Sequence, residues 1–126
     1  MPKKILDTPS GPAPLGPYSI ATEANGLVFI SGMIAIDPAT GRAVSGGVEP
    51  QTEQIMRNIG AVLADVGLCY DDIVKTTIFV TDMGNFPKVN DINGSYVGEA
   101  KPARATVEVS ALPGGFVVEI ETIAAR

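Results

Sequence analysis

The chain has 126 residues, of which 45% are hydrophobic and 18% charged, and its formal net charge is −5. This is the length of one domain, spanning residues 1–126, and it suffices for a core without disulfides or metals. The nine basic residues are scattered along the chain, whereas a nucleic-acid-binding surface needs a cluster of them, so nucleic-acid partners are disfavoured. The absence of histidine excludes Ser-His-Asp and Cys-His constellations and the commonest ligand of catalytic zinc.

Cysteine usage and hydropathy favour a cytoplasmic location. The single cysteine, Cys69, cannot form a disulfide within the chain, and unpaired thiols are ordinary in a reducing compartment. The N-terminal residues lack the apolar stretch of a signal peptide, and no segment approaches the ~18 consecutive apolar residues of a transmembrane helix. We therefore expect no membrane partner.

The first third of the chain predicts a β-hairpin. Apolar-rich runs at residues 18–22 and 27–30 flank Asn25-Gly26, a pair that suits the positive φ angles of a tight type I′ turn. Residues 37–41, with the sequence Asp-Pro-Ala-Thr-Gly, carry a second turn signal.

The middle of the chain predicts two helices separated by a strand. Apolar residues recur at helical spacing over residues 50–66, with Pro50 near the start and Gly67 just past the end. The β-branched run at residues 73–81 predicts a strand. A shorter helix is expected to begin at Asn85, with a proline in its first turn.

Two further strands are predicted at residues 104–109 and 116–124, joined by the turn at residues 112–115. The expected order is β-β-α-β-α-β-β, which defines a single α+β domain with two helices packed on one face of a mostly antiparallel sheet. The other face of the sheet must be either exposed to solvent or covered by another subunit, and the apolar composition favours a face covered in an oligomer.

The last two predicted strands carry the side chains best suited to bind an anion or to move a proton. Alternation places Arg104, Thr106 and Glu108 on one face of the first strand, and Glu119 and Glu121 share a face of the second. If the two strands pair as a hairpin, the guanidinium meets the carboxylates on one face. The spacing leaves two interpretations open: a solvated cross-strand salt bridge, or an anion-binding arginine beside a carboxylate that orients a water molecule.

Residues 101–113, Lys-Pro-Ala-Arg-Ala-Thr-Val-Glu-Val-Ser-Ala-Leu-Pro, resemble the PARxxVEVxxLP signature of the Rid (YjgF-type) family. Further segments resemble that family in the same order along the chain, and they lie at residues 16–19, 30–32, 73–77, 86–90 and 118–124. The resemblance implies a fold like that of the bacterial chorismate mutases and a homotrimer in which three sheets form a central barrel. It also implies clefts at the subunit interfaces.

The resemblance further implies an enzyme without cofactor or metal that hydrolyses 2-imino and enamine acids, such as 2-aminoacrylate and 2-iminobutanoate, to 2-oxo acids and ammonia. Arg104 matches the residue expected to grip the substrate carboxylate, and Glu119 matches the glutamate beside the attacking water. Tyr18, Ser31, Gly32 and Asn90 match residues that line the cleft. The backbone around Ala105 and Thr106 completes it.

Other functions remain open at this point. A ligand-sensing or protein-interaction module could bind small carboxylates in the same cleft, although binding a carboxylate gains nothing from a neighbouring glutamate. A pericyclic enzyme would need several cations, and the matched cleft offers one. The chain also departs from common family residues, because Thr106 stands where many relatives have cysteine, Met33 where glutamine is frequent and Asn93 where an aromatic residue is common. These departures bear on substrate range more than on the reaction.

Overall fold

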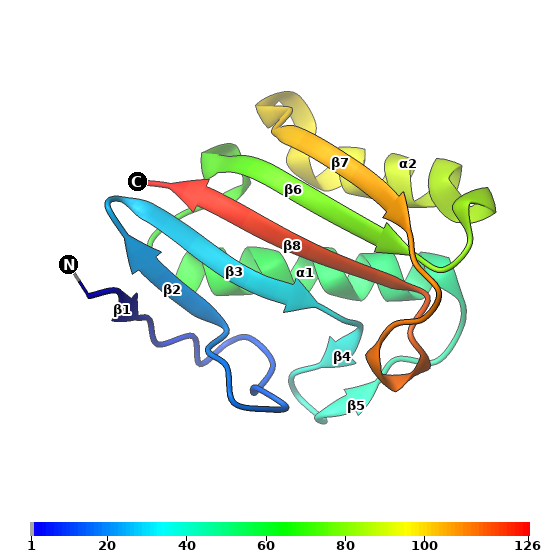
Figure 1. The fold of residues 1–126 in the computed structure, drawn as a ribbon, viewed down its shortest axis with the longest axis horizontal. Coiled ribbons are helices and arrows are strands. Elements are labelled where there is room, and N and C mark those ends of the chain that lie inside the picture. Colours follow the sequence, from blue (N-terminus) through cyan, green and yellow to red (C-terminus); the bar gives the residue numbers. More distant parts are fainter. Residues whose placement is uncertain (1) are drawn as a thin grey trace.

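The computed structural model describes residues 2–126 and contains one six-stranded sheet in the order β1-β2-β3-β8-β6-β7 (Figure 1). Both α-helices pack against one face of this sheet, so the predicted α+β class is confirmed. The strands of the sheet are Lys4–Ile5 (β1), Ala21–Ala24 (β2), Leu27–Met33 (β3), Ile73–Val80 (β6), Ala103–Glu108 (β7) and Val118–Ala125 (β8). The helices are Val48–Asp65 (α1) and Phe86–Val97 (α2), and a separate small hairpin pairs Ile36–Asp37 (β4) with Arg42–Ala43 (β5).

The predicted order of the main elements and both predicted turns are confirmed. Asn25 and Gly26 have φ angles of 52° and 78°, as the hairpin turn between β2 and β3 requires. Residues 38–41 connect β4 and β5, and the Gly41 amide donates to the Asp37 carbonyl over 2.8 Å. The strand predicted from residue 18 is β2, and it begins at Ala21, because the Tyr18 amide is engaged in a turn with the Gly16 carbonyl (2.8 Å).

The predicted hairpin of the last two strands is wrong. Strand β7 pairs in parallel with β6, and β8 pairs antiparallel with β6 on one side and β3 on the other, so that β6 lies between β7 and β8 (Figure 1). The physical reason is the helical crossover. Helix α2 returns the chain to the end of the sheet where β6 began, which makes β7 parallel to β6, as in other β-α-β units. The segment between β7 and β8 is then long enough to cross the end of β6.

This topology separates the two candidate residues. Register partners on neighbouring strands point their side chains to the same face. Arg104 is in register with Thr76, which is buried against the helices, whereas Glu119 is in register with Phe79 on the other face. The expectation that Arg104 and the glutamates of β8 meet on one face within one chain is therefore wrong.

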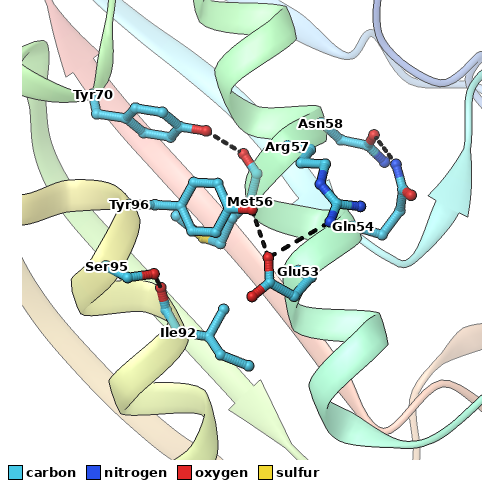
Figure 2. A network of polar contacts seen from close by, with 9 residues as sticks. All are labelled: Glu53, Gln54, Met56, Arg57, Asn58, Tyr70, Ile92, Ser95 and Tyr96. Carbon is cyan, nitrogen blue, oxygen red and sulfur yellow. Dashed lines mark hydrogen bonds and ion pairs between the residues drawn. The ribbon is translucent and has the colours of Figure 1, made fainter.

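The core lies between the sheet and the helices. The apolar stripe of α1 is almost fully buried, with Ile55, Ile59, Val62 and Leu63 each at most 1% exposed. Figure 2 shows how α1 is joined to its neighbours: the Tyr96 hydroxyl of α2 donates to Glu53 (2.6 Å), and the Tyr70 hydroxyl donates to the Met56 carbonyl (2.6 Å). The Tyr96 bond holds α2, and with it one wall of the candidate site, against α1, and the Tyr70 bond holds the segment before β6 against the same helix.

The face of the sheet that looks toward the viewer in Figure 1 carries no helix. Leu27, Phe29 and Val107 on this open face are 38–41% exposed, and Phe79 and Ile123 are half-buried. A single chain thus presents an apolar sheet surface to solvent, which is the usual mark of an interaction site. Within residues 2–126, no helix is long and apolar enough to cross a membrane.

Candidate active site

Two separate cavities hold six of the eight predicted site residues, and Ala105 and Thr106 line neither of them. The first has a volume of about 420 Å³, lies against β3 and β8, and is called the Glu119 pocket here. Four of the predicted residues line it, namely Tyr18, Ser31, Gly32 and Glu119. Three further lining residues were not predicted, namely Leu15, Ile34 and Pro113. The missed residues are apolar or loop positions that no spacing pattern distinguishes.

Gly32 makes room for the Glu119 carboxylate. A β-carbon added to Gly32 would lie 2.9 Å from Cδ and 3.3 Å from Cγ of Glu119, and closer still to Oε2. The strand register of β3 shifts between Ile30 and Met33, which brings the Gly32 backbone against the Glu119 side chain. Glycine is therefore needed here for close approach, and its part in shaping the pocket goes beyond an ordinary bend at a strand end.

The environment of Glu119 tunes its proton affinity. Partial burial raises the pKa of the Glu119 carboxyl, and the nearby Glu121 carboxylate raises it further. Thr77 and Phe79, the register neighbours of Glu121 and Glu119 on β6, carry no positive charge to offset this effect. A carboxyl with these surroundings exchanges protons closer to neutral pH than an ordinary surface glutamate, as a general acid–base residue should.

The Tyr18 and Ser31 side chains also shape the Glu119 pocket. The Ser31 hydroxyl donates to the Ser19 carbonyl over 2.6 Å, which ties β3 to the loop that precedes β2. The Tyr18 hydroxyl accepts a hydrogen bond from the Leu15 amide (3.1 Å), and its ring is 45% exposed. Ser31 therefore holds the wall together, while Tyr18 presents an accessible aromatic surface.

The second cavity, called the Arg104 pocket here, has a volume of about 430 Å³ and lies between α2 and the start of β7. Arg104, Asn90, Asn93 and Lys101 contribute its polar walls. The Arg104 guanidinium carbon lies 5.4 Å from the centre of the Phe86 ring, a cation–π distance that helps to orient the planar group. Asn90 and Arg104 are thus brought together as predicted, although Lys101 was not expected in this group.

Ala105 and Thr106 follow Arg104 on β7 and point to opposite faces. Thr106 is in register with Ile78 on the helix side, and its Oγ1 is buried without a hydrogen-bond partner among residues 2–126. A buried hydroxyl without a partner is costly, and Thr106 lines neither of the two cavities. Met33 is buried in the core, 2% exposed, and Asn93 is 4% exposed in the wall of the Arg104 pocket.

Three comparisons with known proteins identify the family. The family described as Endoribonuclease L-PSP matches residues 8–126. The mouse (Mus musculus) protein named 2-iminobutanoate/2-iminopropanoate deaminase is 40% identical over 98% of this chain and 92% of its own. A Yersinia pestis structure, YyfA of the conserved Rid protein family, is 48% identical with a TM-score of 0.95, covering 99% of this chain and all of its own.

A further solved structure has a ligand. Escherichia coli TdcF with bound serine is 34% identical, with a TM-score of 0.90 over 98% of both chains. Taken together, the sheet order, the helix placement and these similarities show that the chain belongs to the Endoribonuclease L-PSP family, which is the Rid (YjgF-type) family.

Proposed function

We propose that the protein hydrolyses 2-imino acids to 2-oxo acids and ammonia. The observation that carries this proposal is the Glu119 carboxyl, which is held against Gly32 in a pocket and has a raised pKa. A deaminase of this kind needs a carboxylate clamp, a positioned water and a group that moves a proton. Arg104 provides the first, and Glu119 provides the other two functions. The name of the mouse relative supports the same chemistry.

The chemistry needs little beyond positioning. An enamine such as 2-aminoacrylate gains a proton at its terminal carbon and becomes the 2-iminium acid. Glu119 takes a proton from the water as its oxygen adds to the iminium carbon, and passes that proton to the nitrogen of the carbinolamine. The carbon–nitrogen bond then breaks as the carbonyl forms, and the departing ammonia takes up the hydroxyl proton. The sum is one iminium acid and one water giving one 2-oxo acid and one ammonium ion. Because the iminium carbon is already electrophilic, orientation and proton transfer account for the catalysis.

The complete site would lie between two copies of the chain. Within one chain Arg104 faces the helix side of the sheet and Glu119 faces the open side, so one substrate cannot touch both. Strand β7 is an edge of the sheet, and the exposed apolar residues of the open face need a cover. If β7 of one copy packs over the open face of the next, both requirements are met. Closed three-fold repetition of this contact gives the homotrimer.

Mixed oligomers test this arrangement. Arg104→Ala and Glu119→Gln should each retain only residual activity, but subunits of the two variants refolded together should regain activity, because some clefts combine an intact arginine with an intact glutamate. Random mixing in equal amounts restores about one quarter of the sites. No recovery, or a monomer by light scattering at micromolar concentration, would disprove the intersubunit site. The activity itself is measured as faster pyruvate release when a dehydratase generates 2-aminoacrylate from serine.

A carboxylate sensor without turnover is the second candidate, because Arg104 would serve it equally well. The half-buried Glu119 argues against it, since a negative charge in the cleft weakens carboxylate binding unless that charge has a chemical role. RNA cleavage, which the family description names, finds less support in a chain of net charge −5 without histidine. We therefore propose a small-molecule substrate and, from the lone thiol of Cys69, a cytoplasmic location.

A further inference from the structure

The Arg104 pocket contains two cations and no acidic residue in its walls. Arg104 and Lys101 both line it, together with the amide side chains of Asn90 and Asn93. Across the described residues 2–126, the side-chain ion pairs are Glu53–Arg57, Glu49–Lys88 and Glu23–Arg126, so neither cation of the pocket has a carboxylate partner. In the proposed cleft the Glu119 carboxylate of the neighbouring copy serves the attacking water, so a single substrate carboxylate on Arg104 would leave Lys101 without a partner.

Lys101 is held in a strained backbone conformation. Its φ and ψ angles are 43° and 60°, in the left-handed region, and it directly precedes Pro102, whose ring disfavours helical backbone angles in the residue before it. A lysine in such a conformation is uncommon, and a glycine would relieve part of the strain. The left-handed residue ends the 3-10 turn Gly98–Ala100 and leads the chain into β7, which leaves Lys101 in the wall of the pocket.

Asn93 adds a neutral polar group to the same wall. It is 4% exposed, and its side-chain amide nitrogen has the Met56 sulfur at 3.5 Å as its partner, which is a weak acceptor. A buried amide with so poor a partner gains from a ligand oxygen. The pocket volume of about 430 Å³ lies within the range of small-molecule sites and leaves room for a substrate side chain beyond the carboxylate on Arg104.

We infer that this pocket binds two carboxylates at once, one on Arg104 and one on Lys101. The preferred substrates are then imino acids with an acidic side chain, such as 2-iminosuccinate. This inference rests on the proposed function for its catalytic part, because water addition at the imine carbon is assigned to Glu119. The binding part depends only on the charges and space of the Arg104 pocket.

Equilibrium binding tests the pocket without turnover. Succinate and propionate are unreactive probes that carry two carboxylates and one, and their affinities for the intact oligomer can be measured by calorimetry. We expect Lys101→Gln to weaken succinate binding about tenfold while propionate binding stays unchanged, as the loss of one charge-assisted contact predicts. Lys4→Gln, which removes an exposed lysine of β1 outside the pocket, should change neither affinity.

Turnover tests the substrate class. The imines of aspartate and alanine are generated with amino-acid oxidases, and oxaloacetate or pyruvate is followed by reduction with malate or lactate dehydrogenase. The wild-type protein should favour 2-iminosuccinate over 2-iminopropanoate in kcat/KM, and Lys101→Gln should lower that ratio about tenfold. Lys101→Gly should lower it equally while its Tm stays level or rises, because backbone strain is relieved.

The outcomes separate the two proposals. Equal succinate affinity of the wild-type protein and Lys101→Gln, or an unchanged ratio of the two imines, overturns the two-carboxylate pocket and leaves imine hydrolysis standing. If neither imine is hydrolysed, the proposed function fails, and with it the assignment of 2-iminosuccinate as substrate. Succinate binding that depends on Lys101 would still establish the pocket itself.

Discussion

The close approach of Gly32 and Glu119 makes the most direct prediction about catalysis. In Gly32→Ala, the new methyl carbon would lie 2.9 Å from the Glu119 carboxyl carbon, whereas carbon atoms in contact are normally about 3.5–4.0 Å apart. The carboxylate must therefore retreat by roughly 0.6–1 Å. A displacement of about 1 Å at a catalytic group costs on the order of 10²-fold in rate, or about 2.7 kcal/mol of transition-state stabilisation.

The assay is kcat/KM for an imino acid generated in situ, with Gly47→Ala as the matched control. Gly47 has open space where its β-carbon would be and lies outside both cavities, so the control adds the same methyl group without a contact to another residue. Stability should fall by less than the ~1–3 kcal/mol of core overpacking, because the half-exposed Glu119 side chain can rotate away.

A double-mutant cycle decides whether the methyl group acts through Glu119. In the Glu119→Ala background there is no carboxylate to displace, so adding Gly32→Ala should cost almost nothing more. Wild-type turnover in Gly32→Ala, or losses that add in the double variant, would refute the role given to this contact.

Three other predictions concern single groups. Arg104→Lys should keep the fold and the assembly but lower kcat/KM by roughly one to three decades, since lysine cannot bind a carboxylate through a planar fork. The control Arg57→Lys, on the surface of α1, should leave kcat/KM unchanged. Equal kcat/KM values for Arg104→Lys and the wild-type protein would exclude Arg104 as the anchor of the substrate carboxylate. Because the pKa of Glu119 is raised, activity should fall as the pH drops through a value above the pKa of an ordinary glutamate. The folded chain binds this proton more tightly than the unfolded chain, so protonation stabilises the fold, and this stabilisation is lost as the pH rises through the raised pKa. At pH 7, Glu119→Gln should therefore unfold at a higher temperature than the wild-type protein, which a thermal scan checks. Cys69→Ala should leave turnover and assembly as they are, because the exposed thiol makes only a 3.5 Å contact with Asp72, and a large loss of activity would mean that the site is misplaced.

Local sequence signals predicted the elements well where periodicity and turn chemistry agree. The helical stripe of α1, the β-branched run of β6 and the Asn25-Gly26 turn are each determined by neighbouring residues. The two-residue strands β1, β4 and β5 were missed because segments this short carry no periodic pattern. Their pairing depends on partners elsewhere in the chain.

Strand neighbours could not be predicted in the same way. The spacing of Arg104 and Glu119 is compatible with a hairpin, and nothing in residues 104–121 alone reveals that β6 lies between the two strands. A stronger signal was the α2 helix before β7, since a strand that follows a helical crossover tends to run parallel to the strand before it. Lys101 was missed because its importance comes from a backbone angle and a cavity wall, neither of which has a sequence pattern.

The parallel pairing of β7 with β6, in place of the predicted hairpin, suggests a physical connection between assembly and catalysis in the proposed trimer. A salt bridge between Arg104 and Glu119 in one chain would have paired the two groups with each other, and a substrate would have had to compete with that contact. The parallel placement of β7 instead keeps the guanidinium and the carboxylate on opposite faces, where neither has an ionic partner among the described residues. The exposed Phe29 and Val107 on the open face would supply the apolar area for the proposed contact between copies. In the proposed trimer, the same contact that covers this face brings an unpaired arginine to an unpaired glutamate, with the substrate between them.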